Sequence, residues 1–204
     1  MIDALAALKR LREGNQRFVA DIRGQGSLTS RRRELTGGQA PFAIILGCSD
    51  SRVPAELVFD QGLGDLFVIR VAGNIVAPSQ VGSVEFAAAR FGTRLVVVLG
   101  HSSCGAVEAT IEQLRRPMRD QSKNLRAIVD RIRPAVEPLL DTGAAHSAEE
   151  LLHRAVRSNV RVSANQLRHG SEILEKMIEN DGLLVVGAEY SLETGVVEFF
   201  DGVP

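Results

Sequence analysis

The sequence of 204 residues predicts one α/β domain with a mostly parallel central sheet, flanking helices and an N-terminal helical arm. Short apolar runs with little alternation are typical of parallel strands buried on both faces, and segments of helical character separate these runs. A fifth strand, Val196–Phe200, follows the turn sequence SLETG, so we expect it to be antiparallel. The parallel strands are expected over Phe42–Leu46, Leu66–Val71, Leu95–Leu99 and Leu183–Val186.

The chain opens with a predicted amphipathic helix over residues 3–19, and Asp3 is placed to cap its N-terminus. A polar connector follows over 20–38, and its run Arg31–Arg33 is interpreted as solvated surface. Because this connector is long, we expect the helix to pack away from its own core. Residues 1–38 therefore form a predicted dimerisation arm with its connector. The apolar face of the helix comprises Ala4, Leu5, Ala7, Leu8, Leu11 and Phe18.

The rest of this single domain, residues 39–204, is expected to form the α/β core. Helices are predicted over Pro54–Gln61 and Ser83–Phe91, and proline is common at the start of a helix. Residues 105–180 lack a strand pattern and predict a helical insertion before the fourth strand. Breaks between its helices are expected at Pro117, Pro134 and Thr142–Gly143.

The composition excludes several classes of function. Lys and Arg total 24 and Asp and Glu total 25, so the formal net charge is −1 and gives no electrostatic reason to expect nucleic acid binding. The apolar runs have strand length, whereas a membrane span needs about 20 residues. The N-terminal residues lack the apolar segment of a secretory signal, so we expect a cytoplasmic protein with no membrane partner.

The two cysteines and one histidine fall just after predicted strands. Cys48 follows the first strand, and His101 and Cys104 follow the third. Because loops at the carboxyl ends of neighbouring parallel strands converge, these side chains can meet. Two thiolates and an imidazole suit zinc, and the lack of a fourth Cys or His nearby leaves a coordination position open, as in catalytic sites. A redox pair of cysteines is the alternative, but the sequence has no Cys-x-x-Cys.

Asp50 and Arg52 add a second feature to this site. In an extended segment, the side chains of Cys48, Asp50 and Arg52 point to one side. The carboxylate could then take the fourth metal position or accept a hydrogen bond from bound water, while Arg52 holds it bidentately and ionised. Two thiolates and a neutral imidazole bring a zinc complex to zero net charge, which makes bound water less acidic than three imidazoles would.

Two segments resemble the zinc motifs of the β-class carbonic anhydrases: CSDSRV at 48–53 and GHSSCGAV at 100–107. The resemblance extends from the N-terminal arm to Gly195. It implies that Cys48, His101 and Cys104 bind Zn²⁺ and that Asp50 and Arg52 form the catalytic dyad. The implied reaction is the reversible hydration of carbon dioxide to bicarbonate and a proton. The implied substrate-binding residues are Gln39, Phe67, Phe86 and Gly105.

The resemblance also carries expectations about assembly and regulation. It implies a homodimer or homotetramer in which the N-terminal helix reaches over a partner subunit and the active sites lie at the dimer interface. An allosteric subgroup of the family has a closed state, in which the aspartate binds zinc, and an inhibitory bicarbonate pocket built from a tryptophan, an arginine and a tyrosine. Arg70 and Tyr190 match two of these, whereas Ile45 stands at the tryptophan position. We therefore expect weaker bicarbonate inhibition than in that subgroup.

Two other functions stay open on the sequence alone. One is hydration of carbon disulfide or carbonyl sulfide on the same scaffold, which release of sulfide would identify. The other is a non-catalytic zinc protein with a structural or sensory metal. Asp50, Arg52 and Gln39 argue against the second, because a purely structural site needs none of them.

Overall fold

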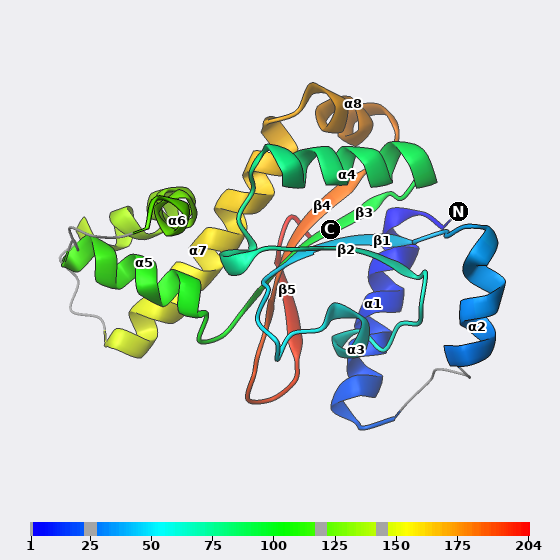
Figure 1. The fold of residues 1–204 in the computed structure, drawn as a ribbon, viewed down its shortest axis with the longest axis horizontal. Coiled ribbons are helices and arrows are strands. Elements are labelled where there is room, and N and C mark those ends of the chain that lie inside the picture. The colour runs from blue at the N-terminus through cyan, green and yellow to red at the C-terminus, as the bar shows by residue number, and fades with distance from the viewer. Residues whose placement is uncertain (1, 23–27, 117–121, 142–146) are drawn as a thin grey trace.

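The fold is a twisted five-stranded sheet with helices on both faces (Figure 1). The computed structural model describes residues 2–22, 28–116, 122–141 and 147–204. The strand order is β2-β1-β3-β4-β5; the first four strands run parallel and β5 is antiparallel to β4. The predicted fold class is confirmed. The strands are β1 (Ala43–Gly47), β2 (Leu66–Arg70), β3 (Leu95–His101), β4 (Leu184–Tyr190) and β5 (Val197–Asp201).

The strands β3 and β4 continue past the apolar runs that predicted them. Backbone pairing between them extends to His101 and Tyr190, since Gly100 and Gly187 leave room for Val160 of a covering helix. A Cβ atom at Gly100 would lie 2.5 Å from a Val160 methyl. As a result, His101 is the last residue of β3.

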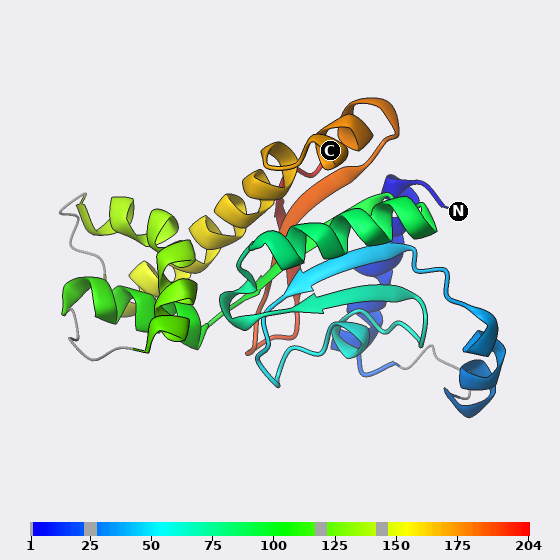
Figure 2. The ribbon, with the colours of Figure 1, turned by 45° about the horizontal axis from the view of Figure 1, so that its top comes forward.

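Helices cover the two faces of the sheet in separate layers (Figures 1 and 2). One apolar cluster joins the sheet to α1 (Ala4–Val19) and α3 (Ala55–Val58). A second cluster joins the other face to α4 (Pro78–Phe91), α7 (Ala148–His169) and α8 (Glu172–Asn180). A third lies beyond the carboxyl ends of the parallel strands, between α5 (Gly105–Arg115), α6 (Lys123–Asp141) and α7. None of the described helices is long and apolar enough to cross a membrane.

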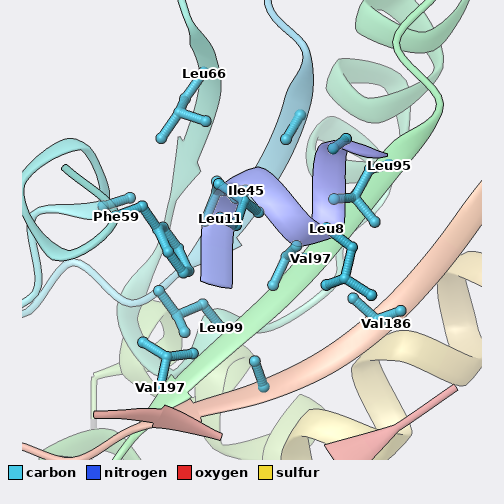
Figure 3. Packing of buried hydrophobic residues seen from close by; sticks show 14 of the residues in the cluster. Leu8, Leu11, Ile45, Phe59, Leu66, Leu95, Val97, Leu99, Val186 and Val197 are labelled. Carbon is cyan, nitrogen blue, oxygen red and sulfur yellow. The ribbon is translucent and has the colours of Figure 1, made fainter. Parts of the chain in front are cut away.

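The prediction that the N-terminal helix packs away from its own core is wrong. Leu8 and Leu11 are buried against Ile45, Val97 and Val186 of the sheet (Figure 3). The physical reason is that this face of the sheet is itself apolar, so that covering it with the helix removes both surfaces from water.

A buried polar contact fixes the same helix. The Asn15 amide nitrogen donates to the carbonyls of Val58 and Gly195, at 3.1 and 2.9 Å, and its oxygen accepts from the Val197 amide. These bonds join α1 to α3 and to the start of β5. The Asp3 cap is as predicted, since its carboxylate accepts from the Ala6 amide at 2.8 Å.

The described part of the predicted connector is not all loop. It contains the short helix α2 (Leu28–Glu34) and a 3₁₀ turn, Leu35–Gly37. Arg31 differs from the solvated surface expected of it, because its guanidinium pairs with the Asp65 carboxylate and donates to the Leu63 carbonyl. The buried Asp65 side chain needs a cationic partner, which is what draws Arg31 inward.

The helices of the core differ from the prediction in their ends. The helix after β1 is one turn, and α4 begins at Pro78 rather than Ser83 because Pro78 fits the first turn of a helix. The predicted break at Pro134 is wrong: α6 continues through it, held by buried Ile132 and Val136 on either side. This burial offsets the hydrogen bond that Pro134 cannot donate. The breaks predicted at Pro117 and Thr142–Gly143 lie outside the described residues.

Candidate metal centre

The structure brings the two cysteines and the histidine together at the carboxyl ends of two adjacent strands. Cys48 follows β1 and His101 ends β3, and these strands pair in parallel with Gly47 opposite Leu99. Cys104 caps α5 after a two-residue turn. The ligand atoms of the three side chains all lie within 4.8 Å of one another, and all three residues are buried. Ligand atoms around a tetrahedral zinc are about 3.5 Å apart, so the spacing suits one ion.

His101 is oriented for metal binding through a single nitrogen. Its ring is fully buried, and Nδ1 lies 2.9 Å from the Ser102 carbonyl oxygen, which fixes the proton on Nδ1. Nε2 is left without a hydrogen-bond partner among the described residues. A buried ring nitrogen of this kind is costly unless something binds it, so the donor set fits a metal ion. Burial lowers the pKa of this imidazole, but the nearby Cys48 sulfur, the Ser102 carbonyl and the Asp50 carboxylate outweigh it, and the net shift is upward.

The two sulfur atoms have different environments. The pKa of the Cys48 thiol lies well below its usual range, because the adjacent Cys104 thiol, the nearby His101 ring and the Gly73 amide, which donates to Sγ at 3.3 Å, favour its anion over the opposing effect of burial. The pKa of Cys104 is raised, because the neighbouring Cys48 anion favours its protonated form and because the thiol is deeply buried. One sulfur is thus already prepared as the anion that a metal ion requires.

Asp50 and Arg52 form a bidentate pair beside this group. Arg52 Nε and Nη2 donate to the two carboxylate oxygens at 2.9 and 2.7 Å, and the Arg52 amide also donates to Oδ1. The Arg52 hydrogen bonds hold the pKa of the Asp50 carboxyl well below its usual range. Asp50 Oδ2 lies 3.8 Å from His101 Nε2. The carboxylate is therefore ionised, directed at Arg52 and adjacent to the histidine atom that would bind the metal.

Arg70 fixes the loop that carries this pair. Its Nε donates to the Cys48 carbonyl at 3.0 Å and its Nη2 to the Asp50 carbonyl at 2.6 Å. Ile45 is fully buried beneath α1, and Tyr190, also mostly buried, belongs to the same cluster. Burial raises the pKa of the Tyr190 hydroxyl.

Gln39 is not near the site of its own chain. It lies before β1, whereas Cys48 lies after it, and it is exposed. A strand rises about 3.3 Å per residue, so the five residues of β1 alone separate them by about 16 Å. Gly105, in contrast, borders the site: it follows Cys104, and a Cβ atom there would meet nothing within 4 Å.

Phe67 and Phe86 are also distant from the metal ligands of their own chain. Phe67 pairs with Ile44, four residues before Cys48, which corresponds to about 13 Å along the strand. The rings of Phe67, Phe86 and Phe91 pack together with centroids 5.7–6.2 Å apart. Phe86 is nevertheless 54% exposed. The cluster joins α4 to β2, which is an edge strand of the sheet.

Gly73 was not among the predicted site residues, and Arg70 was expected in a bicarbonate pocket rather than in the contact that it makes. Gly73 supplies the amide that faces Cys48, and Arg70 binds the backbone of the loop rather than facing a free pocket. The available signals were the position of Arg70 at the end of a strand next to β1 and a glycine in the loop that follows.

Comparison with known proteins agrees with this geometry. A family model described as carbonic anhydrase matches residues 43–197. The β-carbonic anhydrase CafA of Aspergillus fumigatus superposes with a TM-score of 0.76 at 25% identity, covering 98% of this chain and 91% of that one. The chain belongs to the β-class carbonic anhydrase family.

Other members show the same relationship. Carbonic anhydrase 2 of Mycobacterium tuberculosis is 38% identical over 192 residues, which cover 94% of this chain and 90% of that protein. A structure described as one of two tetrameric β-carbonic anhydrases of Sordaria macrospora has a TM-score of 0.74 at 25% identity, covering 83% of this chain and 85% of that one. The family assignment establishes the protein as a carbonic anhydrase.

Proposed function

We propose that this chain catalyses the zinc-dependent reversible hydration of carbon dioxide to bicarbonate and a proton. The observation that carries the proposal is the buried group of Cys48, His101 and Cys104 with an ionised Asp50 beside it. Two sulfurs and one nitrogen would hold zinc. The group contains no fourth Cys or His from the described part of the chain, so one coordination position would stay open. Bound there, zinc would supply a Lewis acid that lowers the pKa of a bound water.

Asp50 and Arg52 act on the reacting water. The Asp50 carboxylate accepts a hydrogen bond from it and so turns a lone pair toward the carbon of the substrate. Arg52 holds that carboxylate by two hydrogen bonds, which keeps it ionised and keeps it off the open metal position. Arg70 keeps the loop between Cys48 and Asp50 in one conformation through its two backbone contacts.

The substrate pocket is completed by a second copy of the chain. Gln39, Phe67 and Phe86 are too far from their own Cys48 to contact the same substrate, yet a polar donor and apolar rings suit a pocket for carbon dioxide. Phe86 is exposed on α4 and packs against Phe67 of the edge strand β2, where a partner can approach. We infer a homodimer, or a homotetramer as described for the Sordaria proteins. The free cysteines and the near-neutral charge support action in the cytoplasm.

The test combines metal analysis with kinetics. The purified protein is expected to hold one zinc per chain and to hydrate carbon dioxide in a stopped-flow assay, without releasing sulfide from carbon disulfide. Full zinc occupancy with no hydration activity up to pH 9.5 would establish a non-catalytic metal instead. Sulfide release without carbon dioxide hydration would assign the alternative substrate.

A further inference from the structure

Asn159 lies on α7, on the side that faces the candidate metal centre. It is 1% exposed, and its Nδ2 donates to the Gly73 carbonyl oxygen at 2.8 Å. Its Oδ1 is buried and has no hydrogen-bond partner among the described residues. The side chain therefore makes one specific contact, with the residue whose amide faces Cys48.

Gly73 lies in a turn with left-handed backbone conformation. Its φ and ψ are 70° and 20°, and Asn74 after it also has a positive φ of 42°. A Cβ atom at Gly73 would lie 2.7 Å from Ile132 Cδ1 and 3.1 Å from Ala106 Cβ, so only glycine fits this left-handed position. Within the turn the Asn74 amide donates to the Val71 carbonyl at 3.0 Å, and the Asn159 amide adds a contact from another element of the fold.

We propose that Asn159 is a positioning residue for the metal ligand Cys48, acting through Gly73. By holding the Gly73 carbonyl, the Asn159 amide fixes the turn so that the Gly73 N–H points at Cys48 Sγ, 3.3 Å away. That N–H stabilises a charged sulfur and sets its direction toward His101 and Cys104. The inference rests on the proposed metal binding, since partners outside the ligand set commonly change metal affinity by about 10- to 100-fold.

A purely stabilising role and a positioning role predict different results for this residue. Asn159 contributes to stability through its one Nδ2 hydrogen bond, since its Oδ1 has no partner among the described residues, and removing the amide leaves the buried Gly73 carbonyl unpaired. A stabilising role alone predicts a modest loss of stability with unchanged zinc affinity, whereas positioning predicts a loss of zinc affinity as well. This difference separates positioning from packing.

The test variant is Asn159→Leu, which keeps roughly the volume and removes the donor. Zinc affinity, measured by competition with a chelator, is expected to fall about 10- to 100-fold. In Co²⁺-substituted protein the sulfur-to-cobalt absorption band should shift, because the Cys48 geometry changes. The melting temperature of the metal-free protein should fall only modestly, because the Gly73 carbonyl loses one donor. The matched control is Ser163→Ala, another buried polar side chain on α7, for which zinc affinity should be unchanged.

Unchanged zinc affinity together with an unchanged cobalt spectrum in Asn159→Leu would overturn the inference, as would an equal loss in Ser163→Ala. If Asn159→Leu does not fold, Asn159→Ala removes the same donor without adding apolar bulk and is held to the same outcomes. Failure of the parent protein to bind zinc would instead refute the proposed function. The two failures are therefore distinguishable.

Discussion

The replacement Leu11→Ala tests whether α1 belongs to the core of its own chain. Leu11 is fully buried among Ile45, Val97 and other sheet residues (Figure 3). Removing a buried leucine side chain typically costs 2–5 kcal/mol, so we expect a loss of about 3 kcal/mol in the free energy of unfolding. At about 2–4 °C per kcal/mol for a domain of this size, the melting temperature should fall by roughly 6–12 °C.

The assay is thermal unfolding at several protein concentrations, with light scattering to follow the oligomeric state. Leu5→Ala is the control, because Leu5 lies on the same helix and is 59% exposed, so its effect should stay within about 0.5 kcal/mol. Equal shifts for Leu11 and Leu5 would refute the packing of α1 on its own sheet. So would dissociation of the oligomer by Leu11→Ala with a melting temperature that depends strongly on concentration, since that pattern indicates packing across an interface.

The other predictions concern the site. Cys104→Ser should lose most of the bound zinc, because a neutral hydroxyl replaces a thiolate; full zinc by metal analysis would contradict the ligand assignment. Arg52→Ala should lower carbon dioxide hydration by about 10²-fold or more, since an unheld Asp50 can occupy the open metal position, and parent-like stopped-flow rates would contradict this. The rate of hydration should rise above about pH 8. Asp50 is not the group that titrates there, because its pKa is depressed below the ordinary carboxyl value of about 4. The Asp50–Arg52 pair is therefore intact above about pH 4 and is lost only as the pH falls below the depressed pKa. A flat profile from pH 6.5 to 9.5 would contradict the rise. Bicarbonate should inhibit weakly, because Ile45 is fully buried and Arg70 already binds the Cys48 and Asp50 carbonyls; strong inhibition in the same assay would contradict it.

The features that the sequence predicted well are those set by local pattern. The apolar runs located the four parallel strands, since strands of a parallel sheet covered on both faces are largely apolar, and the turn sequence SLETG located the fifth. Cys48 and His101 could be placed together because each follows such a strand and parallel strands end at one edge. Asp50 and Arg52 are two residues apart, so their pairing is also a local property.

The features that the sequence did not predict depend on contacts between distant segments. The surface against which α1 packs depends on which apolar face of the sheet no other helix covers. The Asn15 hydrogen bonds that fix α1 there join residues more than 40 positions apart. The continuation of α6 through Pro134 depends on burial against α5 and α7 rather than on local propensity. The contact between Asn159 and Gly73 spans 86 positions, and no local pattern indicates it.

The direction of β1 links the proposed chemistry to the assembly. This one strand has Gln39 before its amino end and Cys48 after its carboxyl end, and a strand of five residues cannot fold back to bring them together. Phe67, on the neighbouring strand β2, is likewise displaced toward the amino end. If these side chains contact substrate, they do so in the site of another copy, and that copy's Gln39 and Phe67 complete the site of the first. Assembly is then a requirement of the proposed pocket, independent of the N-terminal helix, whose apolar face is already used within its own chain.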